Sequence, residues 1–267
     1  MIHHVSQNED MVSVVIPYCE KYTPRSKLEE AIESVKRQSV ETELIVVEDE
    51  EPRGVSQARN RGLDRASARY VAFLDADDIW AEDKLERQMN AIYQSGSGLC
   101  VEGEYESTEM FIQAVIDGEV EAVTSSILID TEVVDATFRE RLERLEDWVF
   151  LMEAAVQGGA CFVDDVMTVR KHDDGLSAHS TAEMHYDARI RMAEIIETCN
   201  EIKHLAPRVR RQAHYGIGFR YQRRGEYQRA GQEMLKALRH EFALKPLIML
   251  ILIPILFVKS QLVNILS

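Results

Sequence analysis

The sequence predicts an α/β fold in which a mainly parallel sheet is flanked by helices and followed by a helical C-terminal appendage. Short apolar segments alternate with helical patterns over residues 11–95. Uninterrupted apolar runs are typical of strands buried on both faces, as in parallel sheets covered by helices. Residues 181–200 and 208–240 have helical patterns without intervening strands.

Three strands and three helices are expected in the N-terminal part of the chain. We place the strands at residues 12–17, 44–47 and 70–74, and the helices at residues 26–38, 54–68 and 81–93. In such sheets, ligands bind beyond the carboxyl ends of the strands. The three strands run into Tyr18-Cys19-Glu20, Glu48-Asp49 and Asp75-Ala76-Asp77-Asp78. Three polar strand ends in succession predict a binding site at this edge of the sheet.

The later elements follow from weaker patterns. Residues 120–129 and 160–170 are expected as strands, and residues 148–157 as a helix. The helical stretch 208–240 divides at Gly225 into two antiparallel halves, which predicts a helical hairpin. A stacked repeat array is disfavoured, because stacking needs at least three repeats and the sequence holds one pair.

The charge is unevenly distributed along the chain. The 267 residues include 31 Lys and Arg against 46 Asp and Glu, a net charge of −15. Residues 1–202 hold 19 basic and 43 acidic residues, whereas residues 203–240 hold 10 basic and 2 acidic residues. Because nucleic-acid binding depends on neutralising phosphates, the acidic body argues against a nucleic-acid partner.

The cysteines and the N-terminus indicate a cytoplasmic protein. The four cysteines are scattered, without the spacing of a metal site, and are expected as thiols in a reducing compartment: Cys19, Cys100, Cys161 and Cys199. The first residues, MIHHVSQNED, lack the apolar core of a signal peptide, so we do not expect secretion.

The strongest local motif is FLDADD at residues 73–78, where an apolar strand delivers three carboxylates to its end. Crowded carboxylates repel one another and require a counter-charge. Oxygen ligands suit Mg²⁺ or Mn²⁺, which take one or two carboxylates together with substrate phosphates and water. Alternatively, Asp77 and Asp78 cap the helix expected from residue 81.

Three further motifs have both a functional and a structural interpretation. The segment GVSQARNRGL starts a helix at Gly54 near Arg59 and Arg61, where a phosphate could bind, or it is an ordinary surface helix. Asp147 opens an apolar helix, either as a general base or as a complement to the helix dipole. His172 follows a strand and is either a ligand or a structural residue.

The order of these motifs closely resembles glycosyltransferase family 2, whose members have the GT-A fold and use nucleotide-diphospho-sugar donors. The motifs are VSVVIPYCEKY, LIVVED, GVSQARNRGL, YVAFLDADD, LEDW and VRKHDDGLS, and they cover about residues 11–180. Their combination is specific, whereas no single motif would be. The resemblance therefore implies a GT-A-like transferase domain.

The resemblance also implies individual roles. Pro17, Tyr18 and Glu20 would line the nucleotide pocket, Asp49 would bind the base, commonly uracil, and Arg59 would lie near the nucleotide. Asp75 and Asp77 look like the family's DxD pair, with Asp77 on the metal and Asp75 nearer the ribose. Asp147 matches the catalytic base, and His172 the position of a further metal or diphosphate contact.

The sequence departs from the family pattern after the second strand. The family usually has VDDGSTD there, then a helix and a strand before the GxxxARN helix. Here Glu48 replaces the first Asp, and four residues separate Asp49 from Gly54. We therefore expect a peripheral helix and strand to be missing, close to the base pocket.

The function implied is an inverting transferase that moves a sugar from a nucleotide-diphospho-sugar to a hydroxyl of a glycan or lipid-linked acceptor. A divalent cation, Mn²⁺ or Mg²⁺, at Asp75 and Asp77 would stabilise the leaving group, and Asp147 would deprotonate the acceptor. The alternatives are a metal-dependent phosphohydrolase or nucleotidyltransferase, and a non-catalytic scaffold. The intact DxD and ED pairs argue against a scaffold.

The C-terminal tail completes a predicted division into residues 1–180, 181–241 and 242–267. Residues 247–258 (LIMLILIPILFV) are uncharged and would form about 18 Å of helix, too short for a bilayer core of about 30 Å. Extension to residues 242–266 includes two lysines and two prolines. A membrane span and packing against the enzyme are alternatives, but we favour a segment in the cytoplasmic membrane interface, with the basic helices facing anionic headgroups.

Overall fold

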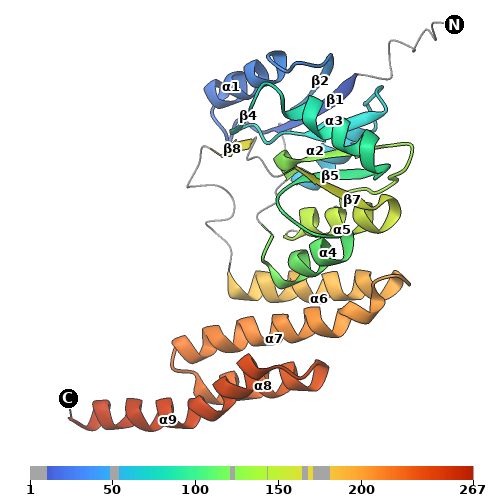
Figure 1. Ribbon diagram of the computed structural model, residues 1–267. Helices are drawn as coiled ribbons and strands as arrows, with labels where there is room; N and C mark the ends of the chain where they lie inside the picture. The colour runs from blue at the N-terminus through green and yellow to red at the C-terminus, as the bar shows by residue number, and fades with distance from the viewer. Residues whose placement is uncertain are drawn as a thin grey trace, which may run out of the picture. The chain divides into compact units, whose positions relative to one another are not determined.

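The computed structural model describes residues 11–48, 54–120, 124–142, 144–163, 168–170 and 181–266 (Figure 1). The chain divides into two compact units. The first comprises Met1–Leu142 and Glu146–Ala178, and the second comprises Glu143–Leu145 and His179–Ser267.

The first unit is a mixed α/β fold, as predicted. Its strands are β1 (Val12–Tyr18), β2 (Thr42–Glu48), β3 (Tyr70–Phe73), β4 (Asp78–Trp80), β5 (Leu99–Glu102), β6 (Ile127–Asp130), β7 (Ala160–Val163) and β8 (Thr168–Arg170). Its helices are α1 (Arg25–Lys36), α2 (Val55–Leu63), α3 (Lys84–Ser95), α4 (Thr108–Asp117) and α5 (Glu146–Gly158), with a short 3₁₀ turn, η1 (Thr124–Ser126).

The central sheet has six strands in the order β2-β1-β3-β6-β5-β7. β1 pairs in parallel with β2 and β3, and β5 pairs in parallel with β7. β6 runs antiparallel to β3 and β5. The mainly parallel sheet predicted from the apolar runs is therefore confirmed, with one reversed strand in its centre.

Both faces of the inner strands β1 and β3 are buried, which explains their uninterrupted apolar runs. On one face, Val14 and Ile16 of β1 belong to a core cluster with Leu28 of α1 and Leu85 of α3. From β3, Phe73 makes edge-to-face ring contacts instead, with Phe138 at 5.1 Å and Phe150 of α5 at 5.7 Å between centroids. Successive strand residues point to opposite faces, so each strand here needs apolar residues at consecutive positions.

Several elements differ from the sequence prediction. The strand expected at residues 120–129 is shorter, because η1 precedes β6. The strand expected at residues 160–170 supplies two strands of different sheets, because β8 leaves the central sheet and pairs antiparallel with β4. The patterns did not predict β4, β5 and α4. Asp78 lies in β4, and α3 begins only at Lys84, so the helix-capping interpretation of Asp77 and Asp78 is wrong.

The second unit is helical. It contains α6 (Ala182–Thr198), a 3₁₀ turn η3 (Lys203–Leu205), α7 (Ala206–Arg223), α8 (Tyr227–His240) and α9 (Leu244–Leu266). The chain reverses between α7 and α8 at Gly225, whose φ of +78° is accessible to glycine at no steric cost. Gly218 of α7 packs against Met234 and Glu233 of α8. The predicted helical hairpin is confirmed.

One face of α9 packs on the hairpin, and another is exposed. Ile253 is buried with Ala230 and Met234 of α8, and the ring of Phe257 contacts Tyr227. Five large apolar side chains recur at intervals of three and four residues with half or more of their surface exposed: Leu244, Ile248, Ile251, Ile255 and Val258. We call these five residues the α9 stripe. In the described part of the chain, no helix combines the length and apolarity needed to cross a membrane.

Candidate active site

The carboxyl ends of β1, β2 and β3 meet at one edge of the sheet. Tyr18, the last residue of β1, is the register partner of Glu48, the last residue of β2. Phe73, the last residue of β3, is paired with Val15, and the next residue, Leu74, donates its backbone N–H to the Val15 carbonyl at 2.9 Å. The sheet thus delivers the polar ends of the first three strands to one place, as the sequence predicted.

The β1–β2 corner carries an ion pair. Arg25, the first residue of α1, donates to Glu48 through Nη1 at 2.9 Å, and its guanidinium lies 5.7 Å from the centre of the Tyr18 ring. Tyr18 is buried, Pro17 is half-buried and Glu20 is exposed. Asp49, the expected base-binding residue, lies outside the described residues, as does His172.

The β2–α2 connection is as short as the sequence implied. β2 ends at Glu48 and α2 begins at Val55, with Gly54 at φ +113° as its N-terminal cap. Because β2 is also an edge strand of the sheet, the usual family helix and strand after it have no counterpart among the described elements.

A buried arginine organises the centre of the site. Arg59 of α2 is 4% exposed, and its Nη2 donates to Oδ1 of Asp75 at 2.7 Å while its Nη1 donates to Oε1 of Glu146 at 3.3 Å. Its guanidinium also lies 5.2 Å from the ring centre of Phe138. Burial lowers the pKa of Arg59, but the charges of Asp75 and Glu146 outweigh burial and raise it. The resemblance implied a place near the nucleotide for Arg59; in the structure Arg59 supplies the counter-charge for Asp75, the first carboxylate of FLDADD.

Asp147 lies in the first turn of α5, next to Glu146. Its Oδ1 accepts a hydrogen bond from the backbone N–H of Trp148 at 2.9 Å. The pKa of its carboxyl is raised to about 6, mainly by burial and next by the charge of Glu146, whereas the charge of Arg59 opposes the shift. A carboxyl group that is poised near neutrality is suited to accept a proton in a reaction.

The backbone before α5 is strained. Leu145 has a φ of +62°, a left-handed conformation that bulky residues rarely adopt. It immediately precedes Glu146 and Asp147, so the chain enters α5 with both carboxylates in the first helical turn. Strained backbone that aims side chains is common at functional sites.

Ser125 is a positioning residue that the sequence did not reveal. Its hydroxyl accepts from the backbone N–H of Asp75 at 3.0 Å and donates to Oδ2 of Asp78 at 2.7 Å, while its carbonyl accepts from Nε1 of Trp80 at 2.8 Å. Asp78 is buried at 3% exposure. The third carboxylate of FLDADD therefore supports the strand end, whereas Asp75 and Asp77 remain half-buried. The signal in the sequence was the polar run Thr124-Ser125-Ser126 before an apolar strand.

The carboxylates fit a metal that is held mainly by substrate. Within the described residues, no three side chains of His, Cys, Asp or Glu lie close enough together to hold a metal ion. Mg²⁺ and Mn²⁺ sites in phosphate-binding enzymes commonly use one or two carboxylates plus substrate phosphates and water. Arg59 engages Oδ1 of Asp75, and Oδ2 accepts no hydrogen bond from the described residues. Asp75 and Asp77 thus match such a two-carboxylate site.

Comparison with known proteins agrees with this geometry. The family model for glycosyl transferase family 2 matches residues 44–114, which include Arg59, Asp75 and Asp77. This part of the chain is therefore similar to glycosyltransferase family 2. The matched range ends before Asp147, so the family match covers only part of the candidate site.

Two curated relatives of this chain are informative. The putative teichuronic acid biosynthesis glycosyltransferase TuaG of Bacillus subtilis is 37% identical over 105 residues, which are 30% of this chain and 40% of the relative. The Escherichia coli enzyme WfgD, a UDP-Glc:alpha-D-GlcNAc-diphosphoundecaprenol beta-1,3-glucosyltransferase, is 30% identical over 109 residues, 32% of this chain and 42% of the relative. The matches thus span less than half of each relative.

Solved structures show the GT-A-like fold. Residues 1–349 of S. aureus TarS in complex with UDP-GlcNAc superpose with a TM-score of 0.62 at 16% identity, over 85% of this chain and 81% of that one. The mannosyltransferase PcManGT from Pyrobaculum calidifontis, in complex with GDP-Man and Mn²⁺, gives a TM-score of 0.58 at 15% identity, over 91% and 79%. At these identities the likeness concerns the fold alone.

Proposed function

We propose that this chain is a family 2 member and an inverting glycosyltransferase, which moves a sugar from a nucleotide-diphospho-sugar, a UDP-sugar, to a hydroxyl of a glycan or lipid-linked acceptor. The observation that carries the proposal is the Asp75–Arg59–Glu146 chain of ion pairs, which joins the donor-side carboxylates to the turn that holds Asp147. A proton acceptor and a diphosphate-binding edge are thereby fixed in one site.

Asp147 acts as the general base in this proposal. Its carboxylate removes the proton from the acceptor hydroxyl while the oxygen attacks the anomeric carbon. The C–O bond to the diphosphate breaks as the new glycosidic bond forms, and the diphosphate leaves with the electron pair. Attack from the face opposite the leaving group inverts the anomeric configuration.

The donor lies along the carboxyl ends of the strands. Pro17, Tyr18, Glu20 and Asp49 line the nucleoside pocket, and Arg59 holds Asp75 in position through the 2.7 Å hydrogen bond. Asp75 and Asp77 would hold a divalent cation, with His172 as a further contact. When bound, Mg²⁺ or Mn²⁺ offsets the charge that develops on the leaving diphosphate.

The relatives support the choice of donor and acceptor. TarS is described in complex with UDP-GlcNAc, and PcManGT in complex with GDP-Man and Mn²⁺. The name of WfgD specifies a UDP-glucose donor and a diphosphoundecaprenol-linked acceptor. A UDP-sugar, a divalent cation and a lipid-linked glycan are therefore our first candidates.

We further propose a cytoplasmic protein that is peripheral on the membrane, with residues 1–180 as the transferase domain, 181–241 as the basic helical region and 242–267 as the membrane-associating tail. The α9 stripe supplies exposed apolar surface, and residues 203–240 supply 10 basic against 2 acidic residues. Apolar side chains that enter the interface and basic residues that face anionic lipid act together in peripheral binding. This attachment would hold the chain at the surface where lipid-linked acceptors occur.

The test combines a donor screen with Asp77→Ala. UDP-sugars should raise the thermal unfolding midpoint in the presence of Mn²⁺, because a ligand that binds the native state stabilises it by mass action. Asp77→Ala should lose this Mn²⁺-dependent shift, whereas Asp64→Ala, an exposed carboxylate after α2, should keep it.

Product analysis with UDP-sugar, Mn²⁺ and acceptor lipid then separates the alternatives. Transfer of the sugar with inverted configuration supports the proposal. Release of free sugar or phosphate without transfer would support a phosphohydrolase instead, and donor binding without any product would support a scaffold. Unchanged Mn²⁺-dependent activity in Asp77→Ala would refute the metal assignment.

A further inference from the structure

A lysine that has no part in the proposed mechanism is buried in the first unit. Lys84, the first residue of α3, has an exposed fraction of 0%. Of the lysines whose side chains the structure describes, Lys84 alone is buried. A buried cation is strongly unfavourable unless neighbouring groups compensate its charge. The partners of this ammonium group therefore show what the lysine does in the fold.

Three groups surround the ammonium of Lys84. Its Nζ donates to Oε1 of Gln88 at 2.6 Å, and Gln88 in turn donates to the carbonyl of Ser126 at 2.9 Å. The same Nζ lies 3.9 Å from Oε1 of Glu102 and 4.4 Å from the centre of the Trp80 ring. The pKa of Lys84 is lowered to about 8, mainly by burial, whereas the charge of Glu102 opposes the shift. At neutral pH the lysine therefore remains mainly a cation, held by an amide oxygen, a carboxylate and an aromatic face.

Trp80 connects this cation to the strand end that carries Asp75. The indole ring lies under the ammonium of Lys84, and the indole Nε1 donates to the backbone carbonyl of Ser125 at 2.8 Å. The hydroxyl of Ser125 in turn accepts a hydrogen bond from the backbone N–H of Asp75 at 3.0 Å. Two side chains thus lead from Lys84 to the backbone of Asp75.

Glu102 provides a second connection to the same serine. Its carboxylate accepts hydrogen bonds from the hydroxyl of Thr168 at 2.6 Å and from the backbone N–H of Thr168 at 3.2 Å. The Thr168 hydroxyl also lies 3.1 Å from the carbonyl of Ser125. Thr168 in β8 is the register partner of Trp80 in β4. Both connections from Lys84 therefore reach the Ser125 carbonyl, one from each strand of the small sheet.

We propose that Lys84 is a positioning residue for Asp75 and acts on it through Ser125. The cation fixes the side chains that hold the Ser125 carbonyl, and the Ser125 hydroxyl then fixes the backbone of Asp75. A carboxylate that is already held within about 0.5 Å of its working geometry binds a ligand better than one that must first be ordered. This role rests on the proposed function, in which Asp75 belongs to the donor-binding edge.

Amide hydrogen exchange of the full chain, without added metal or donor, tests the positioning. Lys84→Met removes the charge and keeps an unbranched side chain. The Asp75 amide should exchange about tenfold faster in this variant, because its Ser125 acceptor is no longer held in place. The Leu74 amide, which donates to the Val15 carbonyl at 2.9 Å within the sheet, should change less and provides an internal reference.

A double-mutant cycle tests whether Lys84 acts through Ser125. UDP and Mn²⁺ are the probes, and electron paramagnetic resonance measures the free Mn²⁺. Lys84→Met and Ser125→Ala should each weaken Mn²⁺ binding in the presence of UDP about tenfold. The double variant should bind about as weakly as Ser125→Ala alone, because the connection to Asp75 is already broken at the serine. Losses that arise from a general loosening of the fold would add instead.

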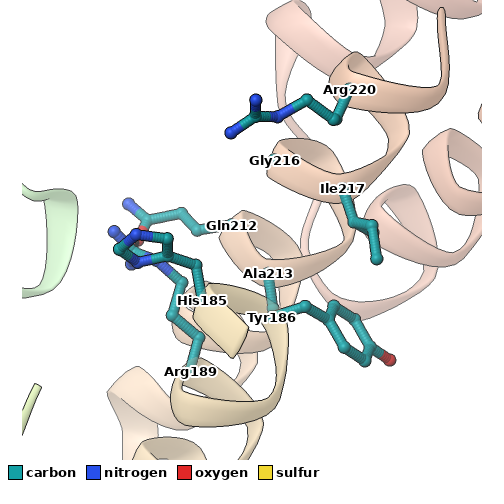
Figure 2. A pocket seen from close by; sticks show the side chains of 8 residues that line it. All are labelled: His185, Tyr186, Arg189, Gln212, Ala213, Gly216, Ile217 and Arg220. Carbon is teal, nitrogen blue, oxygen red and sulfur yellow. Dashed lines mark hydrogen bonds between the residues drawn. The ribbon is translucent and has the colours of Figure 1, made fainter. Parts of the chain in front are cut away.

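Two control variants match the chemical change and the loss of stability. Arg189→Met removes another cation that donates to a glutamine, since Arg189 of α6 donates to Gln212 of α7 at 2.7 Å in the groove shown in Figure 2. Val115→Ala opens a cavity at a fully buried position of α4 and lowers the stability of the first unit. Both variants should keep the wild-type ratio of Asp75 to Leu74 exchange and the wild-type Mn²⁺ affinity.

The proposal is overturned if Lys84→Met leaves the ratio of Asp75 to Leu74 exchange unchanged. It is also overturned if the losses of Mn²⁺ affinity add in the double variant, or if Val115→Ala changes the exchange ratio equally.

A second variant serves if Lys84→Met does not fold. Thr168→Val removes the hydroxyl between Glu102 and Ser125 and leaves the buried charges unchanged, so it should raise the exchange of the Asp75 amide in the same direction. A wild-type chain that binds neither UDP nor Mn²⁺ would refute the proposed function. The exchange ratio in that chain would still support or overturn the action of Lys84 on Asp75.

Discussion

At the scale of single residues, the candidate site depends on the guanidinium of Arg59, which is shared between two carboxylates. Arg59 is buried, and an unpaired guanidinium there would be strongly unfavourable, so Asp75 and Glu146 stabilise it as much as it stabilises them. Asp147 lies beside this network, but the hydrogen bonds of Arg59 go to Asp75 and Glu146, and burial is the main cause of the raised pKa of Asp147. Asp147 is thus the carboxylate whose burial is least offset by hydrogen bonds from Arg59, and it is the one suited to take up a proton.

Asp147→Asn should separate catalysis from stability. We expect turnover to fall by about 10²–10⁴-fold, the usual contribution of a positioned base, while donor binding persists. The folded chain should become more stable at pH 7, because the substitution removes a carboxylate whose ionisation is disfavoured by burial.

Calorimetry at two pH values checks whether Asp147→Asn raises the stability of the folded chain. The raised pKa of Asp147 means that its contribution to stability is present below its ordinary value of 3.8 and is lost as the pH rises through about 6. The stabilisation by Asn should therefore appear at pH 7 and vanish near pH 4. Loss of donor binding or of the folded state in this variant would make Asp147 structural.

The same group predicts the pH dependence of the reaction. A base with a pKa of about 6 is ionised at neutral pH, so kcat/KM should be level above pH 7 and fall about tenfold per unit well below pH 6. Initial rates at low donor concentration in the wild-type chain give the profile. A rate that is unchanged down to pH 4.5 would contradict the assignment of the base.

At the scale of elements, the position of α2 fixes Arg59, and Gly62 fixes the position of α2. A Cβ at Gly62 would lie 2.1 Å from Cγ1 of Val15 in β1, far inside van der Waals contact. The helix can approach the strand only because this residue has no side chain. The close approach brings Arg59, one turn earlier in α2, to the end of β3 where Asp75 lies.

Gly62→Ala should therefore destabilise the first unit by about 1–3 kcal/mol, the usual cost of overpacking. It should also weaken donor binding, because α2 must move away from β1. Gly231→Ala in α8 is the matched control: it meets nothing within 4 Å and should stabilise its helix by about 0.5–1 kcal/mol. Denaturant unfolding measures the free energy of unfolding of both variants, which should fall for Gly62→Ala and rise for Gly231→Ala. Equal stability of Gly62→Ala and wild type would contradict the packing argument.

At the scale of the whole molecule, the chain combines an acidic α/β unit with a basic helical unit that ends in an apolar helix. The charge asymmetry is visible in the sequence, since 43 of the 46 acidic residues lie before residue 203. Anionic surfaces should therefore attract the C-terminal part selectively and with a strong dependence on salt.

Replacing two residues at the centre of the α9 stripe tests whether this helix binds anionic membranes. Ile251→Asn with Ile255→Asn removes two side chains that are 61% and 60% exposed, so folding should be little affected. Binding to anionic liposomes should fall by more than tenfold, since burial of each side chain in the interface is worth about 1.5–3 kcal/mol. Flotation at low salt provides the measurement, with Met110→Asn, an exposed apolar residue of α4, as the control.

The full chain and a chain ending at Arg239 complete the comparison. Liposome binding by the full chain alone supports the membrane proposal. If both chains stay in the soluble fraction at low salt, α9 is a packing element. If the full chain sediments as a dimer and the double variant as a monomer, a second copy covers the α9 stripe instead.

The sequence by itself determined the local elements and the candidate chemistry. Apolar runs between helical patterns gave β1, β2 and β3 nearly to the residue, and β1 and β3 need such runs because they are buried on both faces. The order of motifs indicated a resemblance to glycosyltransferase family 2, and the short link after Asp49 implied the missing helix and strand. These features are local in the chain, and local sequence is enough to specify them.

The tertiary structure decided which carboxylates are paired. Arg59, Asp75 and Glu146 are joined across 87 positions of the chain, and nothing in a single segment shows that Ser125 holds both Asp75 and Asp78. The separation of β8 from β7 likewise depends on its partner β4. Burial and electrostatic coupling arise from which distant segments pack together, so the raised pKa of Asp147 exists only in the folded chain.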